Sequence, residues 1–387
     1  MRRLVLLGVV AWAGFAPAQM ELRVRPFVQI VGDNQMGVSW LVSGNAFGEA
    51  RWRQQGEEWL KAYYAVDGLR EANTPIQRAR ISGYDPALPL DIQTVSMEMR
   101  SFGVYRAPAY GKTVTSQPAR VSALVSAEGE TSFAVFTDVH SRTNCYPLLL
   151  PKLGEGLRFI VLAGDNLNDP PTEQKAVEDL FGPMAWFTEQ GFACLFMRGN
   201  HETRGAFARH LRNYLVLPDD RYYGAMTLGP LRLVWLDCGE DKVDGHKEYY
   251  GLNDFEPYMG AQLEWLKREV QGEAFIRAQW RVVVVHIPPK WREGREWEGT
   301  YRMNAEFAPV LNRAGATAMI CGHTHKPELQ PPSEKEDYGF RGPVFIGGSW
   351  PAEKQVITRV DVRRDQLKIT MIRADGSVFA EQTWPRK

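Results

Sequence analysis

Histidines and carboxylates gather in a few short motifs of this sequence. Five of its seven histidines lie in these motifs, which are Asp138-Val139-His140, Gly164-Asp165, Gly199-Asn200-His201-Glu202, His286 and Gly322-His323-Thr324-His325. Carboxylate, imidazole and amide oxygen ligands suit a borderline metal such as Zn, Mn or Fe. Asp165 is the predicted hub, because the two oxygens of a carboxylate can bridge two metal ions. Two divalent or trivalent ions about 3.5–4 Å apart clamp a phosphate and activate a water, so the motifs predict hydrolysis of phosphate esters.

Each motif directly follows an apolar run of the kind that forms a buried strand. The runs are Phe133 to Phe136, Ile160 to Leu162, Leu195 to Met197, Val282 to Val285 and Met319 to Ile320. In open α/β sheets, ligands bind outside the carboxyl ends of the strands. Polar groups at these ends are therefore predicted to converge on one rim.

His201 adjoins the predicted ligand Asn200 and is not needed to fill either metal. A leaving alkoxide needs a proton, and histidine is the side chain best matched to neutral pH. We therefore predict that His201 is the general acid. Glu202 has two interpretations, as an orienter of His201 or as an exposed residue in the first turn of a helix.

Three further residues are candidates for substrate binding. Arg204 lies three residues after His201 and could reach a phosphate, or lie on a helix surface. Trp291 and Arg292 belong to the run Lys290 to Trp297, where two tryptophans and three basic residues could stack on and neutralise a nucleotide or aromatic phosphate. The alternative is a mixed-charge loop packed on the domain. Trp350 is another candidate for the rim.

The pattern of apolar and polar residues changes near residue 128. Residues 20–127 carry short alternating runs separated by Gly, Asn, Asp and Pro, which is typical of a β-sandwich. In residues 131–387 apolar strands alternate with helical stretches such as Ala176 to Phe187 and Met259 to Val270, so an α/β domain is predicted. Asp375-Gly376 between two alternating runs near the end predicts a hairpin, expected to complete the second sheet of that domain.

Residues 1–18 have the pattern of a secretory signal peptide. Arg2 and Arg3 precede the apolar run Leu4 to Phe15, and Ala16-Pro17-Ala18 supplies a small-residue cleavage pattern. A secreted or periplasmic protein is therefore predicted. The alternatives are a buried first element or an uncleaved anchor, although the run is short for a membrane span. No later stretch is long and apolar enough for one.

Composition limits the partners. Lys plus Arg equals Asp plus Glu at 46 each, and this balance argues against a polyanion such as duplex DNA. A small phosphorylated substrate is the expected partner. The four cysteines lack the paired spacing of a zinc ribbon, and we expect buried free thiols.

Taken in order, the motifs resemble the full motif set of calcineurin-like metallophosphoesterases. The resemblance covers about residues 131–350 and implies a four-layer α/β/β/α sandwich with a dinuclear metal site. It implies one metal on Asp138, His140 and His325, another on Asn200, His286 and His323, and Asp165 as the bridge. The front region resembles a fibronectin-III-like domain, as in purple acid phosphatases. The predicted fold class is therefore an α/β metallophosphoesterase sandwich preceded by an all-β fibronectin-III-like sandwich.

The sequence departs from two branches of that family. Purple acid phosphatases carry a tyrosine ligand three residues after the bridging aspartate, where this chain has Asn168, and they usually lack a histidine at His140. Met197 to Glu202 resembles protein serine/threonine phosphatases, but their Arg-Gly after Gly-Asp is missing. The Asp-x-His form is shared with bacterial phosphodiesterases and nucleases, which is the alternative activity. A metal-binding module without catalysis is the alternative from another class.

Overall fold

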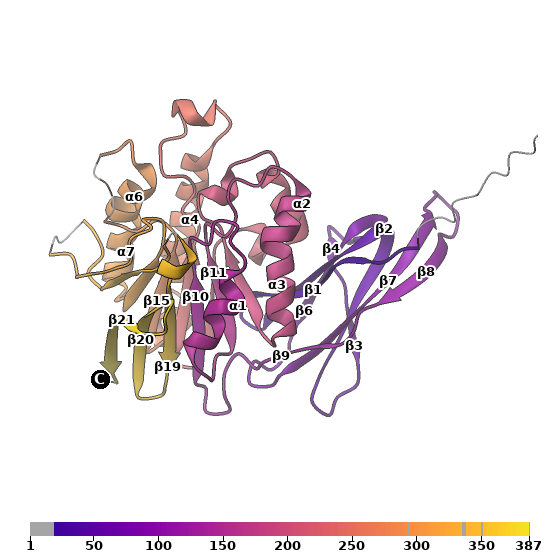
Figure 1. Ribbon diagram of the computed structural model, residues 1–387, viewed down its shortest axis with the longest axis horizontal. Helices are drawn as coiled ribbons and strands as arrows, with labels where there is room; N and C mark the ends of the chain where they lie inside the picture. The colour runs from indigo at the N-terminus through magenta and orange to yellow at the C-terminus, as the bar shows by residue number, and fades with distance from the viewer. Residues whose placement is uncertain (1–18, 291, 293, 335–337, 350, 387) are drawn as a thin grey trace, which may run out of the picture.

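The computed structural model describes residues 19–290, 292, 294–334, 338–349 and 351–386, so the predicted signal peptide lies outside the described residues. The N-terminal part consists of strands, as its alternating runs predicted, and it extends to one side of the α/β part (Figure 1). Its strands are β1 Leu22–Gly32, β2 Gln35–Gln54, β3 Leu60–Ala62, β4 Ala65–Val66, β5 Leu69–Arg70, β6 Thr74–Ser82, β7 Leu90–Ser101, β8 Ala109–Thr115 and β9 Ala119–Val121.

The first sheet of the α/β part has a parallel centre. It contains β10 Thr131–Phe136, β11 Phe159–Ala163 and β12 Ala193–Met197, extended by β19 Val356–Val362, β20 Gln366–Arg373 and β21 Val378–Pro385. The predicted hairpin is β20–β21. Its expected place in the second sheet was wrong, because β19 pairs antiparallel with β10 and carries the hairpin onto the first sheet.

The second sheet lies in the order β13-β14-β15-β16-β18-β17 and is also mainly parallel. Its strands are β13 Gly224–Leu228, β14 Leu231–Leu236, β15 Trp280–Val285, β16 Ala318–Cys321, β17 Glu328–Gln330 and β18 Val344–Ile346. Strands β14, β15 and β16 are buried along their whole length apart from Arg281. Such unbroken apolar runs are what a sheet covered on both faces requires.

Helices cover the outer face of each sheet. The first sheet carries α1 Cys145–Leu149, α2 Glu173–Ala176 and α3 Gly182–Glu189, and the second carries α4 Phe255–Glu269, α5 Glu273–Arg277, α6 Glu298–Arg302 and α7 Ala308–Arg313. Further helical segments are η1 Leu150–Leu153, η2 Val177–Phe181, η3 His201–Thr203, η4 Ala208–Tyr214, η5 Pro218–Asp220, η6 Lys247–Tyr249, η7 Met303–Phe307 and η8 Ala352–Lys354.

The core shows why the layers form. In β10, Phe133 and Val135 belong to the apolar cluster between the two sheets, whereas Ala134 and Phe136 pack with the helices outside. This two-residue alternation places side chains on both faces of the strand. The fold is therefore the predicted four-layer α/β/β/α sandwich, preceded by a strand-rich region.

The N-terminal region is joined to the first sheet rather than merely tethered to it. Gln29 in β1 pairs in parallel with Cys194 in β12. The backbone N–H of Val28 donates to Thr188 Oγ1 at 2.9 Å, and the rings of Phe27 and Phe181 stack 5.6 Å apart. These buried contacts make the region a fixed extension of the sheet.

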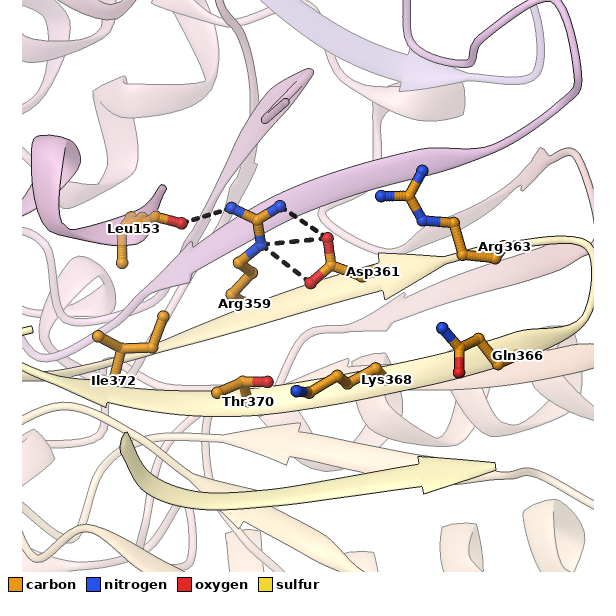
Figure 2. Close-up of a pocket in the computed structure, with 8 residues that line it drawn as sticks. All are labelled: Leu153, Arg359, Asp361, Arg363, Gln366, Lys368, Thr370 and Ile372. Carbon is orange, nitrogen blue, oxygen red and sulfur yellow. Dashed lines mark hydrogen bonds and ion pairs between the residues drawn. The ribbon is translucent and has the colours of Figure 1, made fainter. Parts of the chain in front are cut away.

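The exposed face of β19 and β20 carries a cavity of about 400 Å³ (Figure 2). Arg359 crosses it, donates to the carbonyl of Leu153 and pairs with Asp361 at 2.8 Å. The bond from Arg359 to Leu153 ties the end of η1 to the sheet. All four cysteines are free and buried, as the sequence predicted.

Candidate metal centre

The predicted ligands converge where the strands end. Asp138, His140, Asp165 and His325 offer ligand atoms within 4.8 Å of one another, and Asp165, His286 and His323 form a second such group. Asn200 joins the second group, because its Oδ1 lies 2.9 Å from His323 Nδ1. Asp165 belongs to both groups. A bridging carboxylate, the role predicted for Asp165 from the sequence, would occupy this position.

The first group is built from loops at opposite ends of the motif series. His140 Nε2 and His325 Nε2 lie 2.8 Å apart, and His325 Nε2 lies 3.4 Å from Asp138 Oδ1. The backbone N–H of His323 donates to both oxygens of Asp138, at 2.9 and 3.0 Å. The loop after β16 therefore holds the carboxylate that follows β10.

The second group is more deeply enclosed, and His286 is fully buried in it. Its Nδ1 lies 3.0 Å from the carbonyl oxygen of Ala163, which can only accept, so Nδ1 carries a proton. Its Nε2 makes no hydrogen bond within the described part of the chain, yet lies 3.0 Å from Asp165 Oδ2. A histidine oriented through its other nitrogen, with Nε2 beside a carboxylate, has the arrangement of a metal ligand.

The electrostatics of the centre favour a cation. Burial lowers the pKa of His286, but Asp165 outweighs this effect and raises it to about 10. Burial and the positive charge of His286 lower the pKa of His323 to about 3. The carboxylates thus draw a proton to one buried imidazole, and a bound metal ion competes with that proton. The donor set of carboxylate, imidazole and amide oxygen fits the implied metals.

The backbone of the motifs adopts a conformation that L-residues seldom take. Five of the predicted ligands have φ between 47° and 73°, and they are Asp138, His140, Asp165, His323 and His325. Two glycines leave room for predicted ligands: a Cβ at Gly164 would lie 2.6 Å from His286 Nδ1, and one at Gly348 would overlap the Asp138 carboxylate. Such backbone strain collects at functional sites.

Glu202 holds the loop of the central aspartate. It is fully buried and accepts the backbone N–H groups of Asp165, Asn166, Leu167 and Gly199 at 2.7–2.9 Å. Burial, with the nearby Asp165, raises the pKa of Glu202, and these N–H groups oppose the rise. Glu202 lies in the first turn of η3 as one interpretation predicted, but it is buried and not exposed, and its carboxylate binds the Asp165 loop and not His201.

His201 is oriented by a residue that sequence reasoning missed. Asp169 Oδ1 lies 2.9 Å from His201 Nδ1, and His201 Nε2 lies 3.9 Å from Asp165 Oδ2. Burial lowers the pKa of His201, but the bond to Asp169 and the charge of Asp165 raise it overall. The signal for Asp169 was an acidic residue in the loop after Gly164-Asp165.

The predicted substrate-binding residues have different surroundings. Arg204 pairs with Glu240 at 2.7 Å and Asp241 at 3.2 Å, so carboxylates already neutralise it. Arg292 lies on an exposed loop with its guanidinium 4.1 Å from the ring centre of Trp297. Trp291 and Trp350 lie outside the described residues.

Comparison with known families connects this geometry to a chemistry. The calcineurin-like phosphoesterase family matches residues 131–327, about half of the chain and all of the motifs. The chain belongs to the calcineurin-like phosphoesterase family. It is therefore a hydrolase of phosphate esters, and the resemblance stated from the motifs is confirmed.

Solved structures add the fold. Purple acid phosphatase PPD1 from yellow lupin (Lupinus luteus) seeds superposes with a TM-score of 0.70 at 11% identity, over 94% of this chain and 74% of that one. A conserved uncharacterised protein from Streptococcus pneumoniae TIGR4, a predicted phosphoesterase, has a TM-score of 0.30 at 12% identity, over 66% of this chain and 98% of that one. The comparison with curated proteins found no match.

The lupin structure confirms the fold that the sequence predicted for this calcineurin-like phosphoesterase. Asn168, which stands where the purple enzymes have a tyrosine, is exposed. Among the described residues, no helix has the length and apolar character needed to cross a membrane.

Proposed function

We propose that the protein is a secreted phosphoesterase that holds two metal ions and hydrolyses small phosphate esters. The observation that carries the proposal is the sharing of Asp165 between two groups of ligand atoms, each within 4.8 Å. Secretion rests on the signal-peptide pattern of residues 1–18. Zn, Mn and Fe are the candidate metals, because the donors mix nitrogen and oxygen.

Two half-sites follow from the geometry. We call Asp138, His140 and His325 the outer half-site, and Asn200, His286 and His323 the inner half-site, with Asp165 shared between them. When bound, the metals neutralise the phosphate and supply hydroxide at neutral pH. The protein's part is to fix these donors, and the hydrogen bonds from His323 N to Asp138 and from His201 N to Asp165 Oδ1 at 3.0 Å do so.

His201 is the proposed proton donor to the leaving group. Its side chain is 21% exposed, so a substrate can reach it, and Asp169 fixes its ring through Nδ1. Nε2 then faces the shared Asp165, where the departing oxygen needs its proton. Because both carboxylates raise the pKa of His201, the imidazole keeps that proton closer to neutral pH.

Substitution of the shared carboxylate tests the proposal. Asp165→Ala and Asn200→Ala should abolish metal-dependent release of p-nitrophenol from p-nitrophenyl phosphate, whereas Asp365→Ala, an exposed aspartate, should retain it. Metal content measured on the same samples should fall with activity. Full activity in Asp165→Ala would sink the proposal, and so would two bound metals without turnover of any phosphate ester.

A phosphodiesterase or nuclease is the second candidate. The observation that favours it is His140, the histidine of the Asp-x-His form, whose Nε2 lies in contact with His325. Turnover of mono- and bis-p-nitrophenyl phosphate by one preparation separates the two. A kcat/KM for the diester above that for the monoester would assign the chain to diesters.

A further inference from the structure

The hairpin formed by β7 and β8 ends in an apolar tip that faces solvent. Phe102 is 62% exposed, Val104 is 78% exposed and Tyr105 is fully exposed. Every residue from 101 to 110 is exposed apart from the half-buried Pro108. Single apolar residues on a surface are normal, but a cluster of large ones marks a contact surface. Three within four residues form such a cluster.

Paired strands hold this tip away from the body of the molecule. Met99 pairs with Tyr110, and Ser101 pairs with Ala109 directly below the tip. The backbone N–H of Ala109 also donates to Ser101 Oγ at 3.3 Å. The tip is therefore presented by a hydrogen-bonded ribbon.

The hairpin end carries a positive charge. The charged residues within 98–112 are three cations and one carboxylate, which are Arg100, Arg106, Lys112 and Glu98. Glu98 lies 3.4 Å from Arg100. Even when Glu21 is counted with them, because it follows Gln19 beside the hairpin, the cations outnumber the carboxylates. An anionic partner is therefore favoured.

The hairpin lies at the end of the molecule away from the metal centre. Figure 1 shows β7 and β8 at one end of the long axis, with α6 and α7 of the α/β part at the other. Gln19, the first described residue, lies at the hairpin end, because its Oε1 accepts from Lys112 Nζ at 2.7 Å. A partner bound to the tip leaves the metal centre open to solution.

The size of the tip favours a lipid surface over a protein. A standard protein interface buries about 800 Å² on each partner. At about 150–250 Å² for a whole aromatic side chain, the three tip side chains stay below that area. A bilayer needs no matching groove, because its headgroup layer accepts aromatic side chains and its anionic lipids attract Lys and Arg.

We propose that the β7–β8 tip binds the surface of an anionic lipid bilayer. Phe102, Val104 and Tyr105 enter the headgroup layer, and Arg100 and Arg106 beside them face the lipid phosphates. The contact is interfacial and spans nothing. It is independent of the metal centre and adds a location to the proposed function.

Cosedimentation with vesicles tests this proposal. The chain from Gln19 onward, which keeps every described residue, should bind vesicles of phosphatidylcholine with about 30% phosphatidylglycerol, and less at high salt. The triple variant Phe102→Ser/Val104→Ser/Tyr105→Ser should bind at least about 10-fold more weakly. Leu69→Ser/Tyr250→Ser/Leu252→Ser, which changes three equally exposed apolar residues elsewhere, should bind like the wild type.

The cations have their own variant. Arg100→Gln/Arg106→Gln should weaken binding to the anionic vesicles about 10-fold, because each cation near such a surface contributes about 1 kcal/mol. Lys267→Gln/Arg277→Gln, two exposed cations elsewhere, should not weaken it. Release of p-nitrophenol from p-nitrophenyl phosphate should be the same in all these variants, which shows that they are folded.

Three results would overturn the proposal. The first is a wild type that does not bind the anionic vesicles, and the second is equal loss of binding in the triple-serine variant and its control. The third is a wild type that elutes as a dimer without binding vesicles and becomes a monomer in the triple-serine variant, which would assign the tip to a second copy of the chain. Vesicle binding is measured without substrate, so failure of the proposed hydrolysis would leave it unchanged.

Discussion

The two proposed half-sites differ in how far they are removed from water. In the inner one, His286 is fully buried, and Asn200 and His323 are 2% and 9% exposed. In the outer one, the His325 side chain is 40% exposed, although Asp138 beside it is fully buried. His140, the third outer donor, is also buried at 6%, so the two half-sites differ in one donor, His325, which reaches solvent.

This difference predicts an order of metal loss. The inner donors are held by Ala163 O and by each other, so they keep their positions when no metal is bound. In the outer half-site, the His325 imidazole is the donor most exposed to solvent. Chelators should therefore remove the outer metal first, and the predictions below test this asymmetry.

Removing one ligand from each half-site should give the largest effect. His286→Ala removes the imidazole nearest to the buried Asp165, and we expect a loss in kcat/KM of about 10³-fold, above the 10–100-fold typical of supporting residues. His325→Ala should retain one metal and recover in excess metal. Activity and metal content of both variants measure this, with His210→Ala as the control. Equal rescue of both variants would contradict the asymmetry.

Glu202 supports both half-sites, so its substitution should weaken both. Glu202→Gln replaces one of two acceptor oxygens by an amide NH₂, which points a donor at backbone N–H groups. We expect metal affinity to fall about 100-fold and the melting temperature to drop. Metal titration and thermal unfolding test this, with the exposed Glu381→Gln as a matched control. An effect confined to one half-site would show that the loop is held by something else.

Gly348 should affect the outer half-site alone. Its φ is 74°, and a Cβ there would overlap the Asp138 carboxylate, so Gly348→Ala should lower outer-metal affinity about 10-fold. Gly245→Ala is the control, since a Cβ at Gly245 meets nothing within 4 Å. A stepwise metal titration resolves the two sites, and loss of the inner metal instead would refute the assignment.

Asp169 should have the smallest effect, because it acts through His201. Asp169→Asn removes the charge that raises the pKa of His201. The imidazolium is then lost at lower pH, so the alkaline limb of the kcat profile should move to lower pH, with a loss of about 3-fold at neutral pH. Inner- and outer-metal affinities should stay unchanged. If the pH profile of kcat does not shift in Asp169→Asn, His201 is not the proton donor.

The sequence predicted the buried strands, which depend on residue periodicity, and the position of the polar residues at the strand ends. Phe133 to Phe136 reads as a buried strand, and Asp138 after it lies at the rim as expected. Spacing alone could not show that the tail pairs with β10, since either sheet would accept an alternating hairpin.

Sequence reasoning failed where long-range contacts decide the role of a side chain. Glu202 was expected to orient His201 or to lie exposed in a first turn, because nothing local reveals that its carboxylate binds the loop of Asp165. Arg204 was expected to reach a phosphate or to lie on a helix surface, because its partners Glu240 and Asp241 follow a strand distant in sequence. Asp169 received no role from the sequence, because its contact with His201 spans 32 residues.

The left-handed backbone of five predicted ligands sets stability against activity. Glycine adopts positive φ without strain, so a substitution such as His140→Gly or Asp138→Gly relaxes the local backbone while it deletes a metal donor. Selection for a more heat-resistant fold would therefore favour glycine at these predicted metal ligands. If the proposed ligand roles hold, the Cβ-bearing residues at these positions trade fold stability for metal binding.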